Sequence, residues 1–306
     1  MSDAATPRVV PPQAQAALYM LAATVFFSIM VTSIRHVSAE VDSFIVVFFR
    51  NLFGALIIAP IVAPRGIGYL RTSKLKLYGW RTALGLGSMM MWFYAVSVTP
   101  VAEAVALSFT SPLFVTVIAV FLLGEKAGLP RWIATAVGFG GAMLVLRPGI
   151  VDITLGHLLL LGSSVLMAGS IIAMKMLSRT EPPERIVAYM VLLFTPVALI
   201  PALFVWEWPS WSAMFWLVVI ASAGTVAHIM FTRALSKADA SAVMPLDFMR
   251  LPFTAIIGYL AFSEVPDIFT LTGGAIIFVS SIYIARRENR DRAARQRIAA
   301  PAAGQD

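Results

Sequence analysis

The sequence predicts an all-α membrane protein with ten transmembrane helices, arranged as two inverted halves of five helices each. Three observations predict this class: the composition, the recurrence of long apolar runs, and a repeat within the chain. Of the 306 residues, 59% are hydrophobic and only 13% are charged, and the mean hydropathy is +0.85. A soluble domain of this length needs a larger charged surface, so the bilayer is the expected solvent.

Apolar runs of roughly 18 to 24 residues recur along the chain, and each is long enough to cross a hydrocarbon core of about 30 Å. The runs are continuous, whereas the strands of a membrane barrel alternate polar and apolar residues. The expected spans are residues 15–36, 43–63, 77–98, 101–123, 130–147, 154–177, 185–205, 211–235, 240–262 and 266–285. The segment before the first span is polar and lacks the pattern of a signal peptide, so we expect an uncleaved first span.

The basic residues predict the orientation. Of the 23 lysines and arginines, only Arg35 and Arg147 fall in expected outer segments, while Arg50 and Arg250 lie inside spans. The other basic residues are expected on the cytoplasmic side: Arg8, Arg65, Arg71, Lys74, Lys76, Arg81, Lys126, Arg131, Lys175, Arg179, Arg185, Arg233, Lys237, Arg286, Arg287, Arg290, Arg292, Arg295 and Arg297. This strong asymmetry predicts a multi-pass protein of the inner (plasma) membrane with both termini in the cytoplasm.

The last basic run, from Arg286 to Arg297, has two interpretations. It can bind anionic lipid or regulate the protein, or it can be a solvated tail that fixes the last span. Charge runs are more often solvated, so the second interpretation is favoured.

The chain repeats itself at a shift of 139 to 140 residues. The segment from Leu107 through Phe109 and Pro112 to Glu125 recurs as Leu246 through Phe248 and Pro252 to Glu264. Each half then holds five spans, and an odd number makes the second half enter the membrane from the opposite side. The expected divisions are a cytoplasmic segment (1–14), a first repeat (15–149), a second repeat (150–286) and a basic cytoplasmic tail (287–306).

These motifs resemble the drug/metabolite transporter superfamily, in particular its ten-span EamA-type members. The resemblance runs from about Leu18 to Arg287 and is carried by Phe48-Phe49-Arg50-Asn51, Phe93-Tyr94-Ala95, Thr110-Ser111-Pro112, Gly124-Glu125, Arg147-Pro148-Gly149 and the echo from Pro252 to Glu264. It implies a central cavity walled by spans one to four and six to nine, and transport of amino acids, nucleotide-like metabolites or vitamins. One departure is that Met190 stands where the repeat would place a partner of Arg50.

Ionisable side chains inside spans are the first candidates for a substrate site, because each costs several kcal/mol at the bilayer centre. Arg50 lies within the second span, where it can bind an anionic group or be satisfied by backbone carbonyls. Asp247 and Arg250 are three residues apart and share a helix face between Pro245 and Pro252. Asp247 and Arg250 can contact the substrate, in which case Asp247 can titrate, or they can neutralise one another. A third alternative is that Arg50 pairs with Asp247.

Other polar and aromatic residues complete the predicted site. Ser108 and Thr110 occupy positions matched to Asp247 and its neighbours, and either line the cavity or bond back to their own helix. Trp92 and Tyr94 can stack on a ligand. Glu103 is either a gate charge or a solvated end residue, and His228 either relays protons or is simply hydrogen-bonded.

The sequence gives little support for an enzyme or for a metal site. The chain has no cysteine, its three histidines lack metal-ligand spacing, and it has no zinc-protease, nucleophile-elbow or Walker motif. We therefore predict a secondary transporter of an amino-acid-like, anionic or zwitterionic solute, with no cofactor, no metal and no nucleic-acid partner. A riboflavin-like vitamin or an S-adenosylmethionine-like metabolite is the alternative substrate, an intramembrane enzyme or scaffold is the rival class, and a homodimer stays open.

Overall fold

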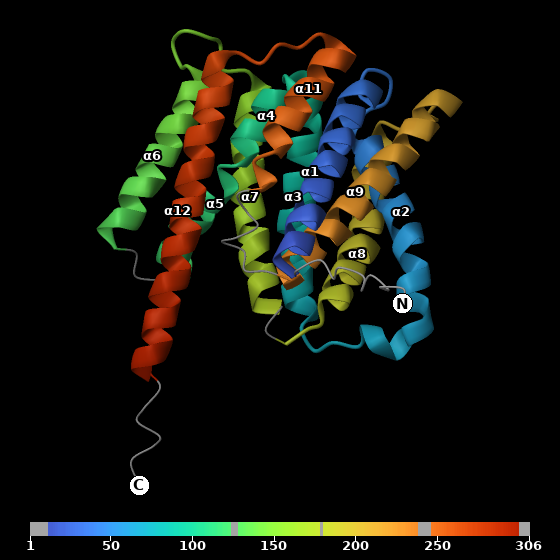
Figure 1. Cartoon of the computed structure of the whole chain (residues 1–306). Helices are drawn as coiled ribbons and strands as arrows, with labels where there is room; N and C mark the ends of the chain where they lie inside the picture. The colour runs from blue at the N-terminus through green and yellow to red at the C-terminus, as the bar shows by residue number, and fades with distance from the viewer. Residues whose placement is uncertain (1–11, 124–127, 178–179, 238–245, 300–306) are drawn as a thin grey trace, which may run out of the picture.

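The computed structural model describes residues 12–123, 128–177, 180–237 and 246–299, and every regular element longer than one isolated bridge in this part is helical. The elements are α1 (Pro12–Val37), α2 (Ser43–Val62), the short 3₁₀ turns η1 (Ala63–Arg65) and η2 (Ile67–Leu70), α3 (Leu75–Val98), α4 (Val101–Ser108), α5 (Ser111–Leu123), α6 (Leu129–Leu146), α7 (Leu155–Leu177), α8 (Pro183–Phe204), α9 (Trp211–Lys237), α11 (Arg250–Phe262) and α12 (Ile268–Ala299). The described chain begins and ends at the lower end of Figure 1, where α1 starts and α12 finishes.

Seven stretches of the described chain are long and apolar enough to cross a membrane. They are Ala14–Val37, Ser43–Pro60, Val101–Ile118, Leu129–Leu146, Leu155–Met174, Trp211–Phe231 and Ile268–Arg287. The apolar parts of α8 and α11, Ala188–Phe204 and Arg250–Phe262, are shorter, and α3 carries Lys76 and Arg81. The structure therefore supports a multi-pass membrane protein, and the count of ten spans stays a prediction.

The helix packing follows the internal repeat. Helix α1 packs along α9, and its repeat counterpart α7 packs along α3, the counterpart of α9. Likewise α2 lies against α9 as α8 lies against α3, and α1 lies against α11 as α7 lies against α5. Helices α2 and α8 pack on each other, as do α6 and α12, so these helix pairs are retained when the two halves are exchanged. This is the two-repeat architecture that the sequence predicts.

Helices α6 and α12 form a pair at one edge of the bundle, at the left of Figure 1. Two glycines allow their close approach, because a Cβ on Gly141 would lie 2.8 Å from the carbonyl oxygen of Gly273. Small residues at such crossings let two membrane helices pack backbone to backbone. This pair lies outside the other helices. Its members correspond to spans five and ten, the two spans that the family resemblance leaves out of the cavity wall.

The fourth expected span is not one continuous helix. It breaks at Phe109 and Thr110 into α4 and α5, because Pro112 has no N–H to donate to the carbonyl of Ser108. The Ser111 hydroxyl donates to that carbonyl instead, at 3.0 Å.

The ninth expected span is interrupted at the equivalent place. A turn at Phe248 and Met249 precedes α11, which starts at Arg250. Pro245, which the sequence singled out beside this turn, lies outside the described residues, as does Glu125 at the end of the fourth span. The two breaks lie in one region, since the rings of Phe109 and Phe248 are 5.8 Å apart.

Two basic residues that the charge pattern assigned to cytoplasmic segments are buried within helices. Arg131 lies inside α6 with 6% of its surface exposed, and Arg81 lies inside α3 with 7% exposed. The orientation itself stays a prediction. Arg81 becomes an ionisable residue within a helix, of the kind that the sequence analysis sought.

Candidate functional site

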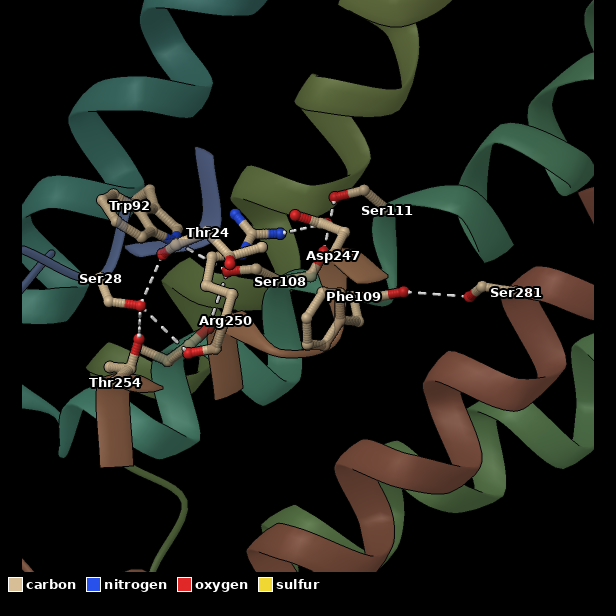
Figure 2. Close-up of polar contacts among 11 residues, drawn as sticks. Thr24, Ser28, Trp92, Ser108, Phe109, Ser111, Asp247, Arg250, Thr254 and Ser281 are labelled. Carbon is tan, nitrogen blue, oxygen red and sulfur yellow. Dashed lines mark hydrogen bonds and ion pairs between the residues drawn. The ribbon is translucent and has the colours of Figure 1, made fainter. Parts of the chain in front are cut away.

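The second helix break holds an ion pair. Arg250 Nη2 donates to Asp247 Oδ2 at 2.8 Å, across the turn between Asp247 and the start of α11 (Figure 2). The Arg250 guanidinium also lies over the rings of Phe27, at 5.3 Å, and Phe109, at 5.1 Å. Of the two pairings that the sequence left open, the structure has Asp247 with Arg250.

A hydroxyl pair ties this break to α1. Thr254 donates to Ser28 Oγ at 3.0 Å, and Ser28 Oγ lies 3.3 Å from the Arg250 carbonyl oxygen (Figure 2). Neither residue was predicted from sequence, because a serine in an apolar run gives no sign of which helix it faces. The contact fixes the N-terminal end of α11 against the first half.

The first break is satisfied by neutral groups. Ser108 Oγ accepts a hydrogen bond from Trp92 Nε1 at 2.7 Å and donates to the Ala104 carbonyl at 2.7 Å. Thr110 is fully buried and donates to the Leu107 carbonyl at 2.6 Å. Both hydroxyls thus bond back to their own helix. Tyr94 lies apart from this cluster on α3, with 38% of its surface exposed.

Arg50 lies in the interior, where its hydrogen-bond partner is a neutral side chain. It is 6% exposed, and its Nη1 donates to the Asn51 side-chain oxygen at 3.0 Å. Asn51 is itself anchored, because its Nδ2 donates to the Val47 carbonyl at 2.8 Å. No carboxylate among the described residues lies within ion-pair distance of Arg50. A buried guanidinium held only by a neutral amide can accept an anionic ligand.

The part of α9 between Gly224 and His228 lies near both Arg50 and Phe27. Its Nδ1 lies 2.8 Å from the Gly224 carbonyl, and a Cβ on Gly224 would lie 3.7 Å from Arg50 Nε and Nη2. The His228 ring meets the edge of Phe27 at 5.1 Å, and Phe27 in turn lies under Arg250. Phe27 thus bridges the two arginine environments, a role that its position in an apolar run did not reveal.

Glu103 contacts the other repeat. Its Oε2 lies 3.1 Å from His157 Nε2, while the backbone N–H of Thr154 donates to His157 Nδ1 at 3.1 Å. A backbone N–H can only donate, so His157 Nδ1 is the acceptor. The proton of the neutral ring is therefore on Nε2, which donates a hydrogen bond to Glu103. Glu103 is therefore not a solvated end residue; it lies in the first turn of α4.

The two arginines predicted on the outer side are both paired there. Arg35 Nε lies 3.5 Å from Glu264, and Arg147 forms an ion pair with Asp267. Glu264 also accepts the N–H of Val101, the first residue of α4, at 2.9 Å. These contacts surround a cavity of about 170 Å³ lined by Glu103, Glu264 and Asp267. We call this region, at the upper end of Figure 1, the outer end, after the orientation that the sequence predicts. Each of its ion pairs joins one repeat to the other.

The Asp267 carboxyl is held in its charged form. Partial burial would raise its pKa, but hydrogen bonds from Thr270 and the nearby Arg147 outweigh burial and lower the pKa below the usual range. The Arg147–Asp267 pair is therefore a permanent ion pair at neutral pH.

Comparisons with known proteins agree with this architecture. The profile of the EamA-like transporter family matches twice, over residues 14–147 and 154–286. A riboflavin transporter of Vibrio cholerae is 33% identical over 281 residues, covering 90% of this chain and 94% of that protein. An S-adenosylmethionine uptake transporter of Rickettsia bellii is 30% identical over 256 residues, covering 84% of this chain and 88% of that protein.

A crystal structure of a protein 18% identical to this chain has the same fold, with a TM-score of 0.63 over 90% of this chain and 98% of that one. The doubled family match, the relatives and the helix pairs that recur in both halves lead to one conclusion. The chain belongs to the EamA-like transporter family of the drug/metabolite transporter superfamily.

Proposed function

We propose that this chain is a secondary active transporter that carries a small organic metabolite with an anionic or zwitterionic group across the inner membrane by alternating access. The observation that carries the proposal is Arg50, which is buried in α2 with no carboxylate among the described residues near it. A charge buried in this way is stabilised when a substrate supplies the opposite charge.

A second candidate substrate is a neutral, planar vitamin of the riboflavin type. The Vibrio cholerae relative, a riboflavin transporter, favours it. The aromatic side chains of Phe27, Phe109 and Trp92 near the two breaks could stack on a planar ring. In this case Arg50 would serve the fold more than the ligand.

Counterflow in sealed vesicles tests both candidates. Purified protein is reconstituted and loaded in turn with unlabelled amino acids, dicarboxylates, riboflavin or S-adenosylmethionine, and uptake of the labelled compound is measured against empty vesicles. Counterflow of an anionic or zwitterionic compound supports the first candidate, and counterflow of riboflavin alone supports the second. Product formation without net transport would point to an intramembrane enzyme, and transport confined to organic cations would contradict the charge argument.

The orientation is part of the proposal. Reporter fusions before residue 14 and after residue 299 should both report the cytoplasm, because the described helices start and finish at the same end of the bundle. A C-terminal fusion that reports the outside would mean an odd number of spans.

A further inference from the structure

Arg81 is a second buried guanidinium that has no ion-pair partner among the described residues. It lies in α3 with 7% of its surface exposed, and its Nη2 contacts only two thioether sulfurs, Met174 Sδ at 3.9 Å and Met190 Sδ at 3.7 Å. Its Nε is buried and has no hydrogen-bond partner among the described residues. Thioethers are weak acceptors, so the hydrogen-bonding capacity of this side chain is largely unused.

Tyr78 adds a second unused donor on the same face of α3. It is three residues before Arg81, 1% exposed, and its ring stacks on Tyr189 with centroids 4.2 Å apart. Its hydroxyl is buried and unpaired among the described residues. Two adjacent buried donors without an acceptor are costly for the fold, and an anion placed between them removes that cost.

The Arg81 guanidinium lies beside the position that the repeat assigns to a partner of Arg50. Residue 190 is the counterpart of residue 50 in the second repeat, and it is a methionine. Arg81 reaches this methionine from the facing helix, α3, so a guanidinium is present there after all. By helix rise, Arg81 lies about 9 Å from the inner end of α3, whereas Arg50 lies about 10 Å from the outer end of α2.

An arginine that only marked the cytoplasmic border would extend its head group to water. Arg81 instead turns inward, between α7 and α8. Methionine side chains at that point can adapt to ligands of different shape.

We propose that Arg81 and Tyr78 form an anion-binding subsite on the inner side of the protein, which takes the carboxylate or phosphate group of the transported metabolite. The proposal rests on the proposed function and extends it. Arg50 and Arg81 give the anion one guanidinium on each side of the midplane, so that each half of the transport cycle exposes one of them. The planar fork of Arg81 can hold two oxygens of the anion while Tyr78 donates to one of them.

Thiol labelling tests the subsite without a known substrate. The chain has no native cysteine, so Met190→Cys places a single thiol beside Arg81. The purified variant is reacted with an anionic and a cationic methanethiosulfonate of similar size, and the ratio of rates is compared with that for a small free thiol. We expect a ratio shifted toward the anionic reagent by about tenfold or more, because the guanidinium charge is close and poorly screened.

Matched second substitutions identify the source of that preference. Arg81→Met should abolish it and Arg81→Lys should keep it, while Arg71→Met, which removes the same charge from an exposed position, should leave it unchanged. Inorganic phosphate should slow labelling of the Met190→Cys protein and have no effect once Arg81→Met is added. An unreactive thiol, an unchanged ratio in Arg81→Met, or labelling that phosphate never slows overturns the subsite, whether or not transport is found.

The transport assay separates the two proposals. For a compound that shows counterflow, we expect Arg81→Lys to raise KM about tenfold and Tyr78→Phe to raise it a few-fold, the usual range for a charged and a neutral hydrogen bond. Normal KM values in both variants would remove the subsite and leave the transporter proposal standing. If no compound shows counterflow but the labelling preference is intact, the transporter proposal is removed and the subsite stands.

Discussion

The arginines at the outer end of this protein and two of the arginines in its interior, Arg50 and Arg81, differ in their partners. At the outer end, Arg35 and Arg147 are each paired with a carboxylate from the other repeat. In the interior, Arg50 and Arg81 contact an amide and two thioethers. Paired charges hold two surfaces together, whereas unpaired buried charges are available to a ligand. The comparison teaches that location inside a span does not by itself define the site; the missing partner does.

The largest expected effect comes from substituting the two arginines inside the expected spans, Arg50 and Arg250. Arg50→Lys should lower transport per folded molecule by about ten- to a hundredfold, because an ammonium cannot reproduce a bidentate contact with an anion. Arg250→Lys should lower it only a few-fold, since a point charge still satisfies Asp247 at one turn's distance. Uptake normalised to monodisperse protein measures both. If Arg50→Lys transports normally and Arg250→Lys is inactive, the substrate binds at the second helix break instead.

Substitutions at the two helix breaks should differ in their effect on the free energy of unfolding. Asp247→Asn leaves Arg250 without its counter-ion and should lower the free energy of unfolding by about 2 kcal/mol, less than for a fully buried pair because Arg250 keeps some exposure. Ser108→Ala removes only a neutral contact and should cost about 1 kcal/mol.

Apparent melting temperatures in one detergent give the ranking. The double variant Asp247→Asn with Arg250→Gln should recover part of the loss. If it is no more stable than Asp247→Asn alone, the pair does not account for the effect.

The outer end should respond more weakly. Glu264→Gln removes the partner of Arg35 and a charged acceptor for the Val101 N–H, both partly exposed, so we expect a change of about 0.5–1 kcal/mol. A thiol introduced by Ala102→Cys in the outer cavity reports this change, and its labelling rate should rise a few-fold. Glu207→Gln, which removes an exposed carboxylate, is the control and should leave the rate unaltered.

The smallest expected effect concerns pH. The pKa of Asp267 is lowered, so its pairing stabilises the fold above the ordinary aspartate pKa and is lost only as pH falls through the lower folded value. The difference in melting temperature between the chain and Asp267→Asn should therefore stay constant from about pH 7 to pH 5 and shrink below about pH 4. A difference that vanishes by about pH 6 would show that another group controls the outer end.

Much of the architecture was predictable because it depends on local composition. Apolar runs and the repeat at a shift of 139 to 140 residues indicate helices and duplication without any knowledge of contacts, whereas the orientation that the loop charges predict stays a prediction. The pairing of Asp247 with Arg250 was one of the alternatives that sequence left open, since residues three apart face the same side of a helix. The break before Pro112 was not predicted, although proline supplied the signal.

The sequence by itself therefore determined a duplicated, membrane-spanning helical chain with an arginine buried in its second span. The tertiary structure decided which charges are neutralised. Glu103 finds His157, Arg35 finds Glu264, and Arg81 turns inward to Met190 because helices distant in the chain pack side by side. Hydropathy depends on one residue at a time, whereas the partner of a buried charge depends on which helix faces it, and only the folded chain brings those helices together.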